Sequence, residues 1–204
     1  MVWNIVYSIL INEIIMILVY LSDPSEKSIY FKELNLSLGL KNWKIIDDEK
    51  SVIGVENSLI IIGRNRLSKE RKKRFKKIFD KAIKNNLKII GIEQGMFIIN
   101  EIFGGEKPFK TISQGHEMFI GLGTKLASII GGSGNVKVIF SSPENIKINH
   151  KADKLMASAI NINTGFIEAI ELKGEGEILG VLWPVLGNKK LPNGFENIIN
   201  YIVD

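Results

Sequence analysis

The chain has 204 residues, of which 45% are hydrophobic and 24% charged, and this composition is typical of a globular protein with its own hydrophobic core. It contains no cysteine, which excludes thiol catalysis, disulfide bonds and cysteine-based zinc sites. The formal net charge of +5 is mildly basic, and much of the excess lies in the stretch RNRLSKERKKRFKK at residues 64–77. The abundance of Lys, Ile and Glu resembles the composition of proteins from hot-growing organisms.

The N-terminal residues 1–21 are apolar enough to raise the question of a membrane-spanning segment. Asn12 and Glu13 fall near the middle of this run, where an acidic side chain in a spanning helix costs about 2.5–3.5 kcal/mol. The run also lacks the basic start and the small-residue cleavage site of a signal peptide. We therefore expect a leading element at residues 1–13, no membrane anchor and a cytoplasmic protein.

The first half of the chain alternates between expected strands and helices. Short runs rich in Ile and Val, without polar alternation, suit strands that are buried on both faces, and they lie at residues 14–21, 43–47, 58–63 and 87–92. Amphipathic helices are expected at residues 25–38 and 68–86, the second with Ser68 as its N-cap. This alternation is typical of right-handed βαβ units and predicts an α/β fold with a mostly parallel, doubly wound (flavodoxin-like) sheet.

The second half carries shorter, often alternating runs separated by Gly, Asn or Pro, a pattern typical of antiparallel strands. These runs lie at residues 136–140, 146–149, 156–162, 165–172 and 176–183. A final helix is expected at about residues 195–203. Because no repeat and no flexible linker divides the chain, the sequence predicts a single domain over residues 1–204, with antiparallel additions to the sheet in its C-terminal half.

The stretch KIIGIEQGMFIIN at residues 88–100 begins like a buried strand and continues like a helix. Gly91, Glu93 and Gly95 stand at the corner between them. Sharp corners of the form G-x-nucleophile-x-G normally present a reactive Ser or Cys. Here the corner carries a carboxylate instead.

These residues carry a family resemblance. The string GIEQGMFIINEIFGG (91–105) resembles the nucleophile-elbow block of class I glutamine amidotransferases, particularly the gamma-glutamyl hydrolase-like branch. Downstream, TGFIEAIEL (164–172) and ILGVLWP (178–184) are similar to the family's D-G-x-I-E-A-I-E and L-G-V-Q-W-H-P-E blocks. INHKADKL (148–155) stands where the family has a His-containing loop near the substrate. The resemblance spans about residues 14–203.

The departures from the family pattern fall on its catalytic positions. The resemblance implies an elbow Cys that is activated by a His and a Glu of the W-H-P-E block. This chain has Glu93 at the elbow, and Pro184, Val185 and Leu186 follow Trp183. Thiol-based amide hydrolysis needs a thiolate and a base within hydrogen-bond reach. The leading hypothesis is therefore a catalytically degenerate pseudoenzyme that acts through binding or assembly.

The resemblance also implies an oxyanion hole at the corner, formed by the backbone N–H of Gln94 and by a second N–H near Gly63 and Arg64. These donors and the dipole of the following helix favour negative charge. We expect the Glu93 carboxylate to fill the hole with a lowered pKa, which leaves a plugged, inactive pocket. Two alternatives remain: Glu93 acts as nucleophile or general base in altered amidotransferase or hydrolase chemistry, or the pocket binds a small molecule without reacting. The expected pocket residues are Gly63, Arg64, Gln94, Gly95 and His150.

The two histidines give weaker signals. His116, in SQGHEMF, resembles a part of the family that is not catalytic, whereas His150 lies in the loop that the resemblance places over the pocket. The two are not at metal-ligand spacing, so we expect neither a metal site nor a cofactor.

The basic stretch at residues 64–77 is expected to face solvent, since the apolar face of its helix is occupied. Its candidates for binding an anion are Arg71, Lys72, Arg74 and Lys76. A solvated Lys-rich face, an acidic partner protein and nucleic acid all fit this pattern, although aromatic side chains for base stacking are scarce. The family resemblance adds a synthase as a possible partner, because family members often work beside a synthase that consumes the released ammonia.

Overall fold

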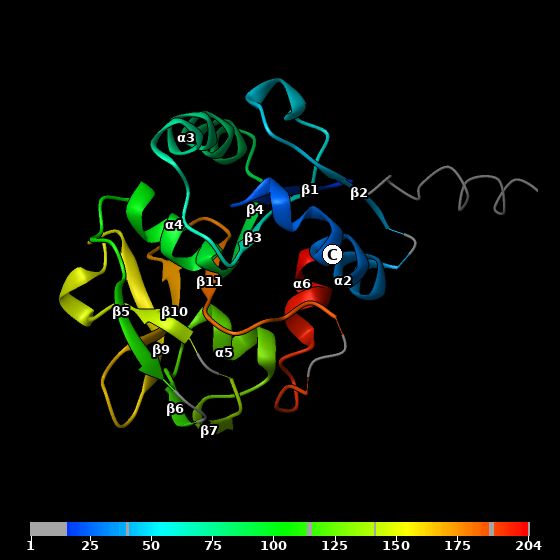
Figure 1. Ribbon diagram of the computed structural model, residues 1–204. Coiled ribbons are helices and arrows are strands. Elements are labelled where there is room, and N and C mark those ends of the chain that lie inside the picture. The colour runs from blue at the N-terminus through cyan, green and yellow to red at the C-terminus, as the bar shows by residue number, and fades with distance from the viewer. Residues whose placement is uncertain (1–15, 40, 114–115, 141, 188–189, 204) are drawn as a thin grey trace, which may run out of the picture.

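The computed structural model describes residues 16–39, 41–113, 116–140, 142–187 and 190–203 (Figure 1). The leading element expected at residues 1–13 lies outside these ranges. A nine-stranded sheet runs through the molecule in the order β2-β1-β3-β4-β11-β10-β9-β6-β7. Pairings from β2 to β11 are parallel and those from β11 to β7 antiparallel. The predicted α/β class, a parallel sheet with antiparallel additions, is confirmed.

The parallel part of the sheet follows the strands expected in the first half. Its strands are β1 (Met16–Leu21), β2 (Asn42–Ile45), β3 (Ser58–Gly63), β4 (Lys88–Glu93) and β11 (Ile178–Val181). The segments between them form the 3-10 helices η1 (Pro24–Glu26) and η2 (Glu49–Ser51) and the α-helices α2 (Lys27–Leu38), α3 (Lys69–Lys84) and α4 (Gln94–Ile102). Ser68 caps α3 as predicted, because its hydroxyl accepts a hydrogen bond from the Arg71 N–H at 3.3 Å.

Two hydrophobic cores lie on the two faces of the sheet, with helices covering both (Figure 1). In β1, Ile17 and Val19 belong to the core under α2, whereas Leu18 and Tyr20 belong to the core under α3 and α4. Strands buried on both faces need apolar side chains at every position, which explains the unbroken Ile and Val runs of the sequence.

The second half departs more from the expected elements. It contains β5 (Phe109–Ser113), β6 (His116–Ile120), α5 (Lys125–Ile130), β7 (Gly134–Val138), β8 (Ser142–Asn145), the 3-10 helix η3 (Ile148–His150), β9 (Leu155–Asn161), β10 (Ile167–Leu172) and α6 (Asn197–Val203). Strands β5 and β8 pair in a separate two-stranded sheet. The strand expected at residues 146–149 is wrong, since β8 ends at Asn145 and residues 148–150 form η3.

Residues 176–183 were expected to form an antiparallel strand, and β11 shows that this expectation is only partly right. Strand β11 pairs in parallel with β4 and antiparallel with β10, so it joins the two parts of the sheet. Within the described ranges, the helices all fall short of the length and apolar content needed to cross a bilayer.

Candidate functional site

The predicted strand-to-helix corner is present, and Glu93 stands on it as the last residue of β4. Its backbone has φ 55° and ψ −116°, a conformation that is rare for residues other than glycine. Such strain persists only where the surrounding structure fixes it, and it is common at functional sites. We call this corner, with the first turn of α4, the elbow.

Close packing explains the two glycines of the elbow. A Cβ on Gly95 would lie 2.0 Å from the carbonyl oxygen of Ile61 in β3. A Cβ on Gly91 would lie 2.6 Å from the carbonyl group of Gly95. The first turn of α4 therefore rests directly on the backbone of β3 and β4, and only glycine fits at these two positions.

The Glu93 carboxylate is directed toward α2. Its Oε2 accepts a hydrogen bond of 2.9 Å from the hydroxyl of Tyr30, a buried residue of that helix. Arg64, which follows β3, lies in the same cluster, and its electrostatic interaction with Tyr30 and then with Glu93 raises its pKa. The cluster thus joins a carboxylate, a phenol and a guanidinium at the carboxyl ends of neighbouring parallel strands.

Two observations correct the expectation that Glu93 fills the oxyanion hole. The backbone N–H of Arg64 donates to Oε2 of Glu26 at 3.1 Å, so a different carboxylate occupies this donor. Glu93 makes no capping hydrogen bond to the N-terminus of α4. The difference arises at η1, which brings the buried Glu26 to the end of β3, where its carboxylate takes the donor expected for Glu93.

A cavity of about 420 Å³ remains at the elbow, and we call it the elbow cavity. Its polar lining comes from Arg64, Glu93, Gln94 and Ser142, and its apolar lining includes Phe97, Phe140, Leu182 and Pro184. Of the site residues named from the sequence, Arg64, Glu93, Gln94 and Pro184 therefore come together here. Gly63 pairs with Glu93 between β3 and β4, and Gly95 lies one residue beyond Gln94.

His150 does not line the elbow cavity. It ends η3, where its carbonyl oxygen accepts hydrogen bonds from the Glu106 N–H at 2.8 Å and from Nδ2 of Asn100 at 3.1 Å. Its ring packs edge-on against Phe109 at 5.7 Å. These contacts hold His150 beside the C-terminal end of α4, so the position that the resemblance implied for it is wrong. The side chain of His116 lies outside the described part of the structure, and within that part no three or more possible metal ligands cluster together.

Three contributors to the site were missed from the sequence: Glu26, Tyr30 and Glu144. Glu144 is a buried residue of β8, and its Oε2 accepts hydrogen bonds from Nε2 of Gln94 at 2.7 Å and from Nε of Arg66 at 3.2 Å. A signal existed for Glu26, because the carboxyl ends of parallel strands meet at one edge of a sheet and residues after β1 are thus neighbours of those after β3.

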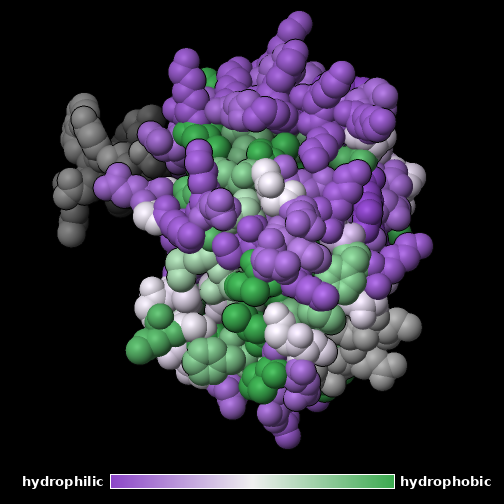
Figure 2. Space-filling model, turned by 90° about the vertical axis from the view of Figure 1, so that its left-hand side faces the viewer, coloured by the Kyte–Doolittle hydropathy of each residue, from purple (hydrophilic) through white to green (hydrophobic). Residues whose placement is uncertain are grey.

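The basic residues of α3 are largely engaged within the fold. Arg71 and Arg74 each form a 2.8 Å ion pair with Asp47, and Lys72 lies 2.6 Å from Glu101. Lys76 lies 3.4 Å from Asp80. Hydrophilic side chains cover the upper part of the face shown in Figure 2, where α3 lies. The four candidates for anion binding therefore all have acidic partners.

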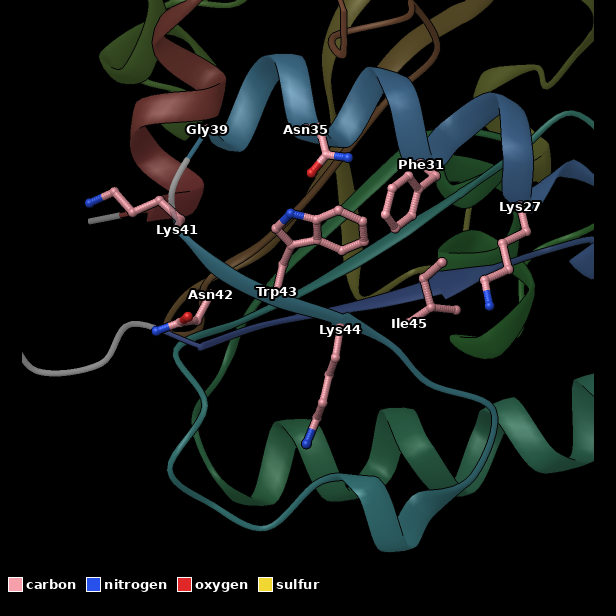
Figure 3. A pocket seen from close by; sticks show the side chains of 9 residues that line it. All are labelled: Lys27, Phe31, Asn35, Gly39, Lys41, Asn42, Trp43, Lys44 and Ile45. Carbon is pink, nitrogen blue, oxygen red and sulfur yellow. The ribbon is translucent and has the colours of Figure 1, made fainter.

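A larger cavity, of about 460 Å³, lies at the edge strand β2 and was not anticipated. Figure 3 shows the rings of Phe31 and Trp43 close together in it, and their centroids are 5.2 Å apart. Lys27 and Lys41 also line it. It shares no lining residue with the elbow cavity, and β1 and β3 separate β2 from β4.

Two buried tyrosines, Tyr20 and Tyr30, should make the free energy of unfolding depend on pH in the alkaline range. Burial raises the pKa of Tyr20 to about 12, and burial together with the negative charge of Glu93 raises the pKa of Tyr30. Above pH about 10 the unfolded chain loses these protons while the folded chain keeps them, so the free energy of unfolding should fall as the pH rises further. Denaturant titrations between pH 8 and pH 11 measure this fall.

The variant Tyr30→Phe isolates one contribution to that fall. It should lower the free energy of unfolding by about 1.5–3 kcal/mol at neutral pH, because a hydrogen bond to a charged group is lost. It should also show a shallower alkaline decline than the wild type. An identical decline in the two proteins would contradict the contact between the buried Tyr30 and Glu93.

Comparisons with solved structures identify proteins that share this fold. No protein-family model and no curated protein matches the sequence. Solved structures do match. A chain of PurLQS from Thermotoga maritima is 10% identical with a TM-score of 0.66, over 93% of this chain and 97% of that one. The glutaminase domain of CTPS from Trypanosoma brucei, with bound acivicin, is 12% identical with a TM-score of 0.64, over 92% and 91%.

A protein from Thermoplasma acidophilum that is described as a GMP synthase subunit is 18% identical with a TM-score of 0.63, and the match covers 92% of both chains. At such identities the likeness is one of fold. The chain therefore has the fold of class I glutamine amidotransferase domains.

Proposed function

We propose that this protein is a catalytically degenerate glutamine amidotransferase-like protein, which binds a small molecule in the elbow cavity without hydrolysing an amide. The observation that carries the proposal is the state of the elbow. A carboxylate, Glu93, stands at the strained corner and is held by the Tyr30 hydroxyl at 2.9 Å. The chain contains no cysteine that could replace it as a thiol nucleophile.

The surroundings of Glu93 support binding over covalent chemistry. The Tyr30 hydroxyl donates to the Glu93 carboxylate, and the Arg64 guanidinium interacts with it electrostatically. A nucleophile or base needs a neighbouring group that activates it, and neither of these contacts does so. The described side chains that line the elbow cavity include no histidine or lysine to relay a proton. An elbow that has lost its reactive group but keeps a cavity can still hold a ligand.

The elbow cavity has the size and lining of a small-molecule site. Its volume of about 420 Å³ falls within the usual range of about 300–1,000 Å³ for ligand pockets. Its lining combines the charges of Arg64 and Glu93 with the rings of Phe97 and Phe140. A small ligand that carries both polar and apolar groups fits this lining.

Association with a synthase is the second element of the proposal. One of the matched structures is named as a GMP synthase subunit, which supports a synthase partner by analogy of fold. Co-purification of the tagged full chain from its own cells, followed by identification of bound proteins, tests this element. Recovery of a synthase at a fixed ratio to the chain is expected, and recovery of the chain alone contradicts it.

Assays of amide hydrolysis test the elbow. Wild-type protein and Glu93→Gln should both release no ammonia from glutamine and no glutamate from gamma-glutamyl peptides above the buffer rate. Glu175→Gln makes the same substitution at an exposed loop position away from the elbow, and it serves as the matched control. Turnover that is present in the wild type and in the control but lost in Glu93→Gln would overturn the proposal. It would favour the alternative in which Glu93 itself performs altered hydrolase or amidotransferase chemistry.

A further inference from the structure

A second cavity, of about 240 Å³, lies beside the elbow and shares Gln94 with the elbow cavity. Three separate segments supply its positive charges: the loop after β3, the first turn of α3 and the loop after α4. The four cationic side chains are Arg66, Lys69, Lys72 and Lys107. We call this space the basic cavity.

The charge of the basic cavity is only partly balanced. Glu101 is the acidic residue of its lining, and it pairs with Lys72 at 2.6 Å. Arg66 pairs with Glu144 at 2.5 Å. Neither Lys69 nor Lys107 has an ion pair with any acid in the described ranges of the chain. Both lysines are exposed side chains that line the cavity, and a bound anion would supply the countercharge that they lack there.

The arrangement is also partly fixed before any ligand arrives. Nη2 of Arg66 donates to the carbonyl oxygen of Pro108 at 2.6 Å, and its Nε donates to Glu144 at 3.2 Å, which together hold the guanidinium plane. Lys69 is the first residue of α3, where the helix dipole favours negative charge. Leu67 and Ile98 give the cavity an apolar lining, which strengthens electrostatic interactions there.

From these observations we propose that the basic cavity binds a small phosphate-bearing molecule. Guanidinium and ammonium groups that converge from several segments suit the oxygens of a phosphate group. A nucleic acid would instead need a continuous row of available cations along α3. Arg71 and Arg74, which would extend such a row, are both paired with Asp47. The inference is independent of the elbow chemistry, because its cationic residues do not line the elbow cavity.

Isothermal titration of the full chain with inorganic pyrophosphate, at constant ionic strength, tests the proposal. Saturable binding with one site per chain is expected. The double variant Lys69→Ala/Lys107→Ala should weaken it by about tenfold or more, because charge-assisted hydrogen bonds to the anion are lost. The matched control Lys73→Ala/Lys84→Ala removes the same charge from exposed positions of α3 outside the cavity. It should change the dissociation constant by less than about twofold, since exposed charges at a distance are screened.

Three results would overturn the proposal. The first is the lack of saturable binding by the wild type. The second is an equal loss of affinity in the two double variants, which would mean that pyrophosphate responds to overall charge alone. The third is tight binding of generic duplex DNA that both double variants weaken alike, which would assign the surface to nucleic acid. Glu93→Gln should bind pyrophosphate like the wild type, so failure at the elbow and failure at the basic cavity are distinguishable.

Discussion

Replacement of Gly95 by alanine should lower the free energy of unfolding by about 3 kcal/mol, or prevent folding altogether. The new Cβ would lie 2.0 Å from the carbonyl oxygen of Ile61 and 2.8 Å from its carbonyl carbon. Both atoms belong to the backbone of a central strand, so a change of side-chain rotamer cannot relieve the clash. Either α4 moves away from β3, which opens the core, or the elbow loses its shape. Denaturant unfolding at neutral pH measures the effect.

Gly132→Ala is the matched control for this experiment. No neighbouring atom lies within 4 Å of the position that a Cβ on Gly132 would take, and its φ is outside the left-handed region. Its free energy of unfolding should stay within about 0.5 kcal/mol of the wild-type value. If Gly95→Ala were as mild as Gly132→Ala, α4 could not approach β3 as closely as the structure shows.

The elbow was predictable because its signal is local. Gly91 and Gly95 are each required by a contact within the strand–helix unit or with the adjacent strand. The parallel strands were predictable for a similar reason, since burial on both faces leaves an unbroken apolar run. Information of this kind is carried by a few consecutive residues and needs no knowledge of the rest of the fold.

The two-stranded sheet of β5 and β8 was not predictable in this way. Strand β8 contains Pro143 and three polar residues, so it has neither the apolar run nor the alternation of a typical strand. Ile146 is fully buried although it lies outside any strand, and with Ile148 it imitates strand alternation. The strand expected at residues 146–149 came from this coincidence.

Some residues of the candidate site were predictable from the sequence, and others depend on tertiary packing. Arg64, Glu93 and Gln94 follow neighbouring strands, so strand order alone brings them together. The partner of Glu93 could not be found from the sequence, because Tyr30 is 63 residues away and meets it only through the packing of α2. Glu26 differs from Tyr30, because strand order does place residues after β1 beside those after β3. Its carboxylate accepts from the Arg64 N–H, a donor that was expected to face Glu93.

The geometry of the elbow depends on its two glycines and not on the side chain of residue 93. The close contacts of Gly91 and Gly95 are needed for α4 to pack on β3 and β4, whatever side chain stands between them. The side chain of residue 93 takes no part in those two contacts and is instead held by the Tyr30 hydroxyl. The elbow can therefore form without a nucleophile, and likeness of fold to amidotransferase domains does not by itself imply their reaction.

Replacement of Trp183 by alanine should lower the free energy of unfolding by about 3–5 kcal/mol. The side chain is fully buried, and its ring lies 5.1 Å from that of Phe195 and 6.2 Å from that of Phe140. Alanine would leave a large apolar cavity next to Pro184, which lines the elbow cavity. Denaturant unfolding again gives the measurement.

Trp183→Phe separates packing from polar interactions at this position. The buried indole N–H has no hydrogen-bond partner within the described ranges, so phenylalanine removes an unsatisfied donor while it keeps much of the apolar volume. We expect a loss of about 1–2 kcal/mol, well below that of the alanine variant. Equal losses in the two variants would require a hydrogen bond from the indole N–H. In that case a polar contact of Trp183, and not packing alone, would fix the position of Pro184 in the lining of the elbow cavity.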